Sequence, residues 1–203
     1  MARGTSNQGY SQLHLPPVLE PEVDAWSKQG WPGVTQTTHD LLSYWFNRDE
    51  ETQERFYFCQ QRAIETAIYC HEVLQVKTLT QLYERLAPEA LLQHLPLKEE
   101  VESIPFPKYC LKMATGTGKT WVLAALLVWQ YFNNLRGERA GWYCNRFLVV
   151  TPGHEVLNRL LDSFKGKRDL KTGQRNPASS DYAKPLFMPE GSRWRSHFLW
   201  KQS

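Results

Sequence analysis

A chain of 203 residues with a formal net charge of +3 is long enough for one domain of ordinary size, or for one domain with an extension. Hydrophobic residues make up 41% of it and aromatic residues 13%, with eight Trp, so a buried core is expected and wholesale disorder is excluded. The N-terminus is polar, and the longest apolar stretch, Trp121 to Trp129, is half of the ~18 residues that a membrane span needs. We therefore expect neither a signal peptide nor a membrane partner, and a cytoplasmic location.

The distribution of charge is uneven along the chain. Residues 1–105 carry 8 basic and 15 acidic side chains, whereas residues 106–203 carry 16 basic and 6 acidic side chains. The second half is therefore the half that would attract a polyanion, although a merely solvated basic surface accounts for the same counts equally well.

The four cysteines, Cys59, Cys70, Cys110 and Cys144, form no C-x-x-C pair and show no metal-site spacing. We interpret them as reduced core residues of a cytoplasmic protein.

The N-terminal half is expected to be an arm followed by helices. Residues 1–20 are rich in Gly, Ser, Gln and Pro, which predicts a flexible arm. Residues 21–105 are expected to form a mainly helical region, with a first helix near Thr38–Phe46 whose tryptophan is interpreted as a core or domain-docking anchor rather than a base-stacking platform. The charged, proline-containing segment 98–107 is a connector.

A second helix is predicted from about Glu50 to Gln75, with Asp49 or Thr52 as its cap, and a third over 79–95, broken by a proline. Gln60 lies within the second helix. Its amide could both donate to and accept from an adenine edge, although a glutamine on a helix is more often a surface residue.

The sequence M-A-T-G-T-G-K-T at residues 113–120 lies between a strand-like run, Tyr109–Met113, and an apolar helix, Thr120–Phe132. This is the strand, loop and helix order of a phosphate-binding loop, or Walker A motif. Gly116 and Gly118 permit positive φ angles, so successive N–H groups can surround an anion at the positive end of a helix. The alternative is a glycine-rich turn whose lysine happens to face solvent.

Each residue of the loop has a role in this reading. Thr115, Gly116, Thr117 and Gly118 would supply main-chain donors to the phosphates of ATP. Lys119 would reach the β and γ phosphates, and the hydroxyl of Thr120 would coordinate the bridging Mg²⁺. Lys119 and Thr120 are thus the candidate catalytic residues. Met113 departs from the strict pattern, which has glycine at that position.

A second apolar run, Phe147–Val150, has the unalternated composition of a buried parallel strand. Thr151-Pro152-Gly153 ends it, and a helix from Glu155 to Phe164 follows. This succession predicts an α/β fold with right-handed crossovers and both loops at one sheet edge. The basic segment 165–180 is expected to be poorly ordered or to contact phosphates.

These segments together resemble superfamily 2 DEAD/DEAH-type helicases, in the version found in type III restriction enzyme helicase (Res) subunits. Residues 113–120 resemble motif I, in which methionine at the first position is common in that group. Residues 60–64 resemble the glutamine motif, with Gln60 at the adenine-reading position, and residues 147–153 resemble motif Ia. The resemblance touches most of residues 30–198.

The resemblance implies an ATP-dependent DNA helicase or translocase with a RecA-like P-loop NTPase lobe. It assigns nucleic-acid backbone contacts to Thr151, Pro152 and Gly153, and implies DNA and a methyltransferase (modification) subunit as partners. Residues 106–203 would then be an incomplete RecA-like lobe with a partial parallel sheet.

No D-E-x-H or D-E-x-D occurs in the sequence, although the family uses that carboxylate pair to hold Mg²⁺ and activate water. We therefore expect the N-terminal portion of such an enzyme, with weak nucleotide binding and little turnover. Two alternatives stay open: a non-catalytic module that docks a nucleotide or a subunit, and a small-molecule P-loop kinase, for which no acidic base follows the second strand.

Overall fold

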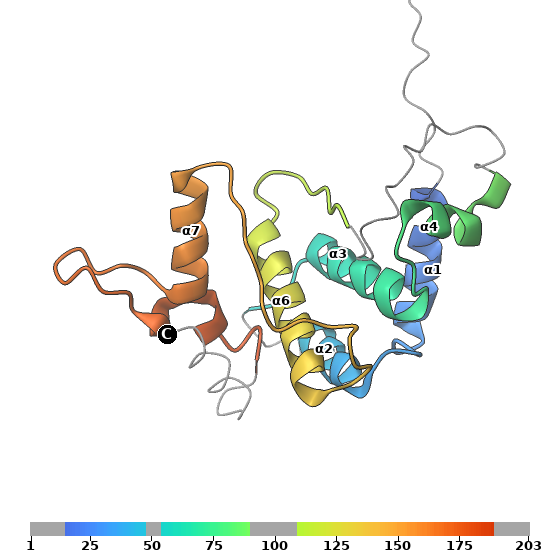
Figure 1. The fold of residues 1–203 in the computed structure, drawn as a ribbon, viewed down its shortest axis with the longest axis horizontal. Coiled ribbons are helices and arrows are strands. Elements are labelled where there is room, and N and C mark those ends of the chain that lie inside the picture. The colour runs from blue at the N-terminus through green and yellow to red at the C-terminus, as the bar shows by residue number, and fades with distance from the viewer. Residues whose placement is uncertain (1–14, 48–53, 90–108, 189–203) are drawn as a thin grey trace, which may run out of the picture. The chain divides into compact units, whose positions relative to one another are not determined.

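The computed structural model describes residues 15–47, 54–89 and 109–188 (Figure 1). Four predictions lie outside these residues wholly or in part: the arm up to residue 14, the caps Asp49 and Thr52, the connector and the end of the third helix. The described residues belong to two compact units. Of the described residues, the first unit comprises 15–32, 65–89 and 109–110, and the second comprises 33–47, 54–64 and 111–188.

Helices make up the regular structure of the described residues. In chain order they are α1 (Pro16–Lys28), α2 (Gln36–Phe46), α3 (Phe58–Ile68), the π-helix η1 (Tyr69–Val73), α4 (Leu79–Leu86), α6 (Lys119–Arg136), α7 (His154–Lys165) and the 3-10 turns η2 (Pro177–Ser179) and η3 (Asp181–Ala183). The described part of the chain contains no β-strand, and its one isolated bridge joins Arg168 to Arg175. The predicted α/β fold with a partial parallel, RecA-like sheet is therefore wrong.

The exposure of the second apolar run shows why that prediction failed. Leu148 and Val150 are 90% and 81% exposed, and Phe147 and Val149 are 39% and 38% exposed. An apolar run becomes a buried strand only when neighbouring strands take its main-chain hydrogen bonds and other elements cover its faces. Neither this run nor Tyr109–Met113 has such a neighbour among the described residues.

Most of the predicted helices are present, but some of them begin at other residues than predicted. α2, α6 and α7 lie where the sequence predicts helices. α3 begins at Phe58 rather than near residue 50, and α1 begins at Pro16, inside the segment that was expected to be an arm. A proline is tolerated in the first turn of a helix because the N–H that it lacks has no partner there. None of the described helices is both long and apolar enough to be a candidate membrane span.

Buried polar contacts organise the first unit around Glu65, whose side chain is fully buried. Its Oε1 accepts hydrogen bonds from Ser27 Oγ (2.6 Å) and from Trp31 Nε1 (3.0 Å). Trp26 is also buried, and its Nε1 donates to the carbonyl of Pro32 over 2.9 Å. Both tryptophans are therefore core residues whose indole N–H groups are satisfied, as expected for buried tryptophan.

Aromatic side chains fill the core of the second unit. Phe56 packs edge-on against Trp45, Trp121 and Phe187, with ring centroids 5.8–6.4 Å apart. Trp45 Nε1 donates to the carbonyl of Phe187 over 3.1 Å, so the segment after η3 is held on α2. Tyr182 also contacts Phe187, and the burial of Tyr182 raises the pKa of its phenol. The interpretation of Trp45 as a core anchor is confirmed.

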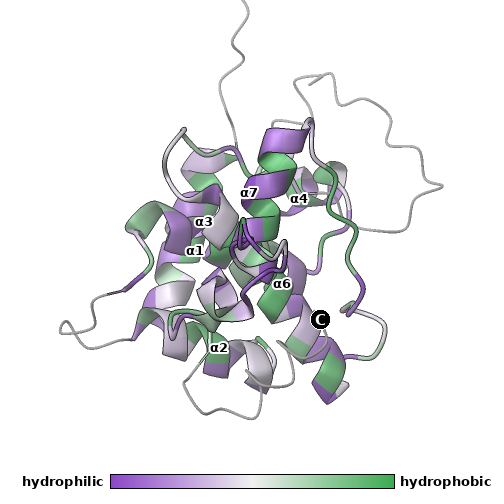
Figure 2. Ribbon diagram, turned by 90° about the vertical axis from the view of Figure 1, so that its left-hand side faces the viewer, coloured by the Kyte–Doolittle hydropathy of each residue, from purple (hydrophilic) through white to green (hydrophobic). Residues whose placement is uncertain are grey.

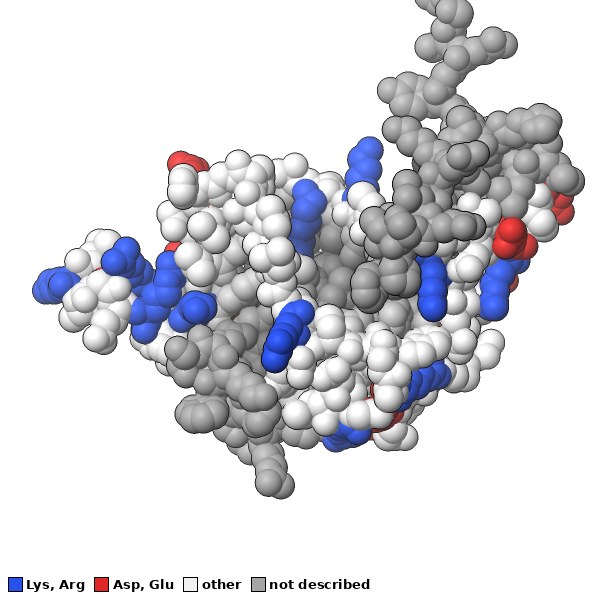
Figure 3. Space-filling model, in the orientation of Figure 1, with Lys and Arg blue, Asp and Glu red and all other residues white. Residues whose placement is uncertain are grey.

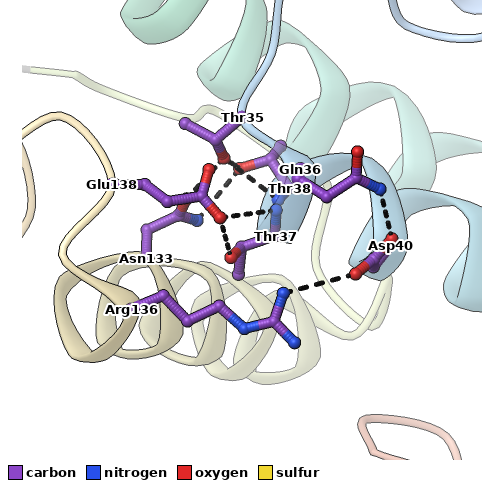
Figure 4. A network of polar contacts seen from close by, with 8 residues as sticks. All are labelled: Thr35, Gln36, Thr37, Thr38, Asp40, Asn133, Arg136 and Glu138. Atoms are coloured by element: carbon purple, nitrogen blue, oxygen red, sulfur yellow. Dashed lines mark hydrogen bonds and ion pairs between the residues drawn. The ribbon is translucent and has the colours of Figure 1, made fainter.

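A buried polar network joins the start of α2 to the last turns of α6 (Figure 4). Thr35 caps α2, because its hydroxyl accepts the N–H of Thr38 and donates to Asn133 Oδ1. Thr38 Oγ1 accepts from Trp129 Nε1 (3.0 Å) and from Asn133 Nδ2 (2.9 Å). Glu138, just after α6, makes a second connection to α2, because its carboxylate accepts hydrogen bonds from both the N–H and the hydroxyl of Thr37. The packing of α2 on α6 is thus fixed by directional bonds as well as by apolar contact.

The cysteines differ in exposure, which corrects the expectation that all four lie in the core. All are free thiols, but only Cys70 is buried, whereas Cys59, Cys110 and Cys144 are exposed. Burial raises the pKa of Cys70 to about 11, from an ordinary value of 9.0. Since the thiolate is the reactive form, two pKa units lower its reactive fraction about 100-fold near neutral pH.

Alkylation of the native chain is accordingly expected to modify the three exposed cysteines quickly and Cys70 only after unfolding. Peptide mass spectrometry after timed iodoacetamide treatment at pH 8, with and without denaturant, measures this difference. The Cys70→Ser variant identifies the slow site. Equal native rates at all four positions would contradict the burial of Cys70.

Candidate functional site

The glycine-rich loop before α6 is curled back on itself. Gly116 and Gly118 have φ values of 82° and 74°, in the left-handed region that favours glycine. The hydroxyl of Thr117 donates to the carbonyl of Ala114 over 2.7 Å, which closes the turn. Gly118 is the N-cap of α6, and its carbonyl accepts the N–H of Trp121 over 2.9 Å. The two glycines therefore adopt the backbone angles that the sequence predicts, although no strand precedes them among the described residues.

Main-chain donors gather on this loop. Within the described residues, the N–H groups of Thr115, Gly116 and Gly118 have no main-chain acceptor, while residues 115 and 116 form a hydrogen-bonded turn. They lie at the start of an 18-residue helix, whose macrodipole places about half a positive charge at this end. Lys119 is exposed at the first position of that helix, and Thr120 is half-buried beside it. Free N–H groups, a helix N-terminus and an ammonium group together suit an oxyanion.

The side chain of Gln60 is hydrogen-bonded to the glycine-rich loop. It is 1% exposed, and its Nε2 donates to the carbonyl of Thr117 over 2.9 Å. Its Oε1 accepts the main-chain N–H of Tyr57 over 2.9 Å, so both ends of the amide are used within the protein. A contact between Gln60 and adenine stays a prediction, and the structure shows a support role that the sequence did not reveal.

Gly118 and Gln60 are in close contact. A Cβ atom built on Gly118 would lie 2.2 Å from Gln60 Nε2, whereas a Cβ on Gly116 would meet nothing within 4 Å. The two glycines are therefore not equivalent, because only Gly118 is required both for its backbone angle and for the space beside it. No local signal could indicate this, since the two contacting residues are far apart in the sequence.

The predicted nucleic-acid contacts lie just before α7. Thr151 Oγ1 is 3.4 Å from the carbonyl of Gly153, and Gly153 is the N-cap of α7 with an extended φ of −177°. Pro152 and Gly153 are exposed. The part of the chain that the structure describes contains no sheet edge that could place them beside residues 115–120, and their contact with nucleic acid stays a prediction.

The metal role of Thr120 also stays a prediction. Among the described residues there is no group of three or more His, Cys, Asp or Glu side chains that could hold a metal ion. A Mg²⁺ ion at this loop would therefore depend on phosphate oxygens and on the Thr120 hydroxyl for its ligands.

A structured basic hairpin follows α7, where the sequence predicted poor order or a phosphate-contacting insertion. We call residues 165–176 the basic hairpin. Arg168 and Arg175 form its antiparallel bridge, and Asn176 N–H donates to the carbonyl of Lys167 over 2.9 Å. In Figure 1 it is the orange loop that projects beyond α7, and Figure 3 shows Lys and Arg side chains gathered on it. The basic residues are Lys165, Lys167, Arg168, Lys171 and Arg175.

α7 itself presents apolar side chains at its surface. None of its residues is buried, and Val156 and Leu157 are 43% and 38% exposed. Figure 2 shows hydrophobic and hydrophilic residues alternating along this helix. Within the second unit it contacts η2, η3 and α6, and Phe164 near its C-terminal end packs on Tyr182 with ring centroids 5.5 Å apart.

A family model described as type III restriction enzyme, res subunit, matches residues 53–186, which include Gln60, the glycine-rich loop, Thr151–Gly153 and the basic hairpin. No curated protein and no solved structure matches the chain.

Proposed function

The chain belongs to the type III restriction enzyme res subunit family, and on that premise we propose that it binds ATP at residues 115–120 as part of an ATP-dependent DNA helicase or translocase. Family membership relates the chain to helicase-type ATP hydrolases. The proposal adds the site and the ligand. The observation that carries it is the curled loop, with its unpaired N–H groups and an exposed lysine at the start of α6.

The residues of the loop fit a triphosphate. The N–H groups of Thr115, Gly116 and Gly118 would donate to phosphate oxygens, and the helix end would favour their negative charge. The Lys119 ammonium would bind the terminal phosphates, since its side chain is exposed and the main chain places it at the first turn. Mg²⁺, when bound with the nucleotide, neutralises phosphate charge, and the Thr120 hydroxyl would be its protein ligand.

We propose binding without appreciable turnover for these 203 residues. Hydrolysis needs a carboxylate that holds Mg²⁺ and positions water, and neither D-E-x-H nor D-E-x-D occurs in the sequence. The basic second half of the chain would also bind DNA. This binding would not depend on the DNA sequence, and it would weaken steeply as the salt concentration rises.

The change Lys119→Ala tests the nucleotide site. ATP with Mg²⁺ is expected to raise the melting temperature of the unaltered chain, because a ligand that binds only the folded state stabilises it. Loss of a charge-assisted hydrogen bond of about 1.5–3 kcal/mol should make the variant need about 10- to 150-fold more ATP for the same shift. Thermal melts over an ATP titration measure this.

Lys112→Ala is the matched control, because Lys112 is also exposed but lies before the loop. It should leave the ATP dependence unchanged. An identical titration for Lys119→Ala and the unaltered chain would refute the site. Absence of any shift, together with co-purification of another subunit, would favour a docking role instead, to which the exposed apolar side chains of α7 are suited. Steady phosphate release that Lys119→Ala abolishes would overturn the expectation of low turnover.

A further inference from the structure

The tip of the basic hairpin exposes a leucine almost completely. Leu170 is 98% exposed and lies between Asp169 and Lys171. A single exposed apolar residue is ordinary on a mobile surface loop. This one is notable because the turn that presents it is closely hydrogen-bonded.

Four hydrogen bonds order the tip. Asp169 N–H donates to the carbonyl of Gln174 (2.8 Å), and Gly173 N–H donates to the carbonyl of Asp169 (2.9 Å). The Asp169 carboxylate accepts the N–H groups of Lys171 (2.7 Å) and Thr172 (3.3 Å), which lowers its pKa below the ordinary value. Leu170 thus projects from a turn whose main chain is satisfied around it.

The base of the hairpin is anchored to the end of α7. Arg175 pairs with Asp162 over 2.6 Å and donates to the carbonyl of Gly166 over 2.7 Å. Gly166 has a φ of 85°, and a Cβ there would lie 1.8 Å from the carbonyl oxygen of Asn176, so the two arms of the hairpin approach closely. The projection is therefore held at both ends rather than tethered loosely.

The charge of this projection is strongly positive. Lys165, Lys167, Arg168 and Lys171 are exposed, while Arg175 is half-buried in its pair with Asp162. Asp169 is the one acid between residues 165 and 176, and its carboxylate is engaged by two N–H groups. The exposed side chains of the basic hairpin therefore place positive charge around the apolar side chain of Leu170.

We propose that the basic hairpin is a wedge for duplex DNA, in which its lysines and Arg168 bind backbone phosphates and Leu170 inserts between adjacent base pairs. Apolar side chains, leucine among them, unstack base steps in this way when basic residues hold the flanking backbone. The inference rests on the DNA-binding part of the proposed function. It adds the segment that makes the contact and the residue that distorts the duplex.

The surroundings of Leu170 favour DNA over other anionic partners. One leucine offers too little apolar surface to anchor the hairpin in a bilayer, where stable attachment needs a broad apolar face or acyl chains. Closely spaced exposed cations match the regular phosphates of a duplex. Binding of the hairpin to vesicles of anionic lipid, without any preference for DNA, would overturn the proposal.

The test uses the full chain and a duplex that carries 2-aminopurine, whose fluorescence rises when a base is unstacked. The unaltered chain should raise this fluorescence, and Leu170→Ala should remove more than about half of the rise while leaving the salt dependence of binding unchanged. Leu135→Ala is the matched control, because Leu135 is 48% exposed at the end of α6. It should leave the fluorescence unchanged.

A second pair of variants tests the phosphate contacts. Lys167→Gln with Lys171→Gln should lower the slope of log affinity against log salt by about 1.8, since each lost phosphate contact removes about 0.9. Lys28→Gln with Lys77→Gln removes the same charge from exposed lysines outside the hairpin and should leave the slope unchanged. Anisotropy titrations with a labelled duplex at several salt concentrations measure it.

The outcomes separate this inference from the proposed function. If the chain binds DNA but the hairpin variants behave like their controls, the hairpin assignment fails and DNA binding stands. If the chain binds no DNA at 50 mM salt, the DNA part of the proposed function fails together with the wedge. The thermal shift with ATP is independent of both, so the nucleotide site is judged separately.

Discussion

Replacing Gly118 by alanine is expected to abolish detectable ATP binding and to lower the free energy of unfolding by about 3–4 kcal/mol. About 1–2 kcal/mol comes from holding alanine in the left-handed region, where the φ of Gly118 is 74°. The rest comes from Gln60, because the new Cβ would lie 2.2 Å from its Nε2. Gln60 must then give up its bonds to Thr117 and Tyr57, at roughly 1 kcal/mol each.

The change Gly116→Ala is the internal control for this prediction. Gly116 has a similar φ, 82°, but a Cβ there meets nothing within 4 Å. Its cost should therefore be the backbone cost alone, about 1–2 kcal/mol. Urea denaturation followed by circular dichroism gives both free energies, and equal losses for the two variants would refute the contact between Gly118 and Gln60.

A double-mutant cycle sharpens the comparison. Gln60→Ala removes the same two hydrogen bonds that Gly118→Ala displaces, so the double variant should be about 2 kcal/mol more stable than the sum of the single changes predicts. The coupling free energy between the two substitutions would be zero if the Gln60 side chain could move away from the new Cβ without losing stability. Since Gln60 is 1% exposed, we expect no such free movement.

The change Asn133→Ala is expected to cost about 4 kcal/mol, the largest loss of stability among the variants discussed. Asn133 is fully buried and makes three hydrogen bonds, to Thr35, Thr38 and the carbonyl of Trp129. Removing one buried partner costs more than the net contribution of a hydrogen bond, about 1–3 kcal/mol for each group that loses its partner. The partners lie on α2 and α6, so the packing of these helices weakens together.

Asn134→Ala is the matched control, because it is the same residue type one position further along α6. Asn134 is half-buried, and its Nδ2 donates to the carbonyl of Tyr143 over 2.8 Å. Its replacement should cost about 1 kcal/mol. Equilibrium unfolding monitored by tryptophan fluorescence compares the two, and a loss below about 1.5 kcal/mol for Asn133→Ala would show that the network is not closed in solution.

Local patterns were sufficient to locate α2, α6 and α7 and the curled loop before α6. The apolar run after Lys119 predicts a covered helix, and α6 buries residues on several faces, among them Val122, Ala124, Ala125 and Val128. Gly116 and Gly118 fix the loop through their own backbone freedom. Such features depend on residues close in sequence, which is why they can be inferred without a structure.

Features that join distant residues could not be inferred in the same way. The prediction of strands at residues 109–113 and 147–150 was wrong because composition records how apolar a segment is, not whether a partner strand lies beside it. The contact of Gln60 with Thr117 and the network between Thr35 and Asn133 are likewise long-range. The order in the basic hairpin was missed because its turn depends on side-chain capping by Asp169.

Both ends of α6 carry a left-handed glycine, Gly118 at the start and Gly137 at the finish. At a rise of about 1.5 Å per residue, the 18 residues between them make a stiff rod of about 27 Å. The glycine-rich loop precedes one end, and near the other end Asn133 and Glu138 are hydrogen-bonded to α2. Because the helix is continuous between these two ends, a displacement of the loop along the helix axis would be carried to α2.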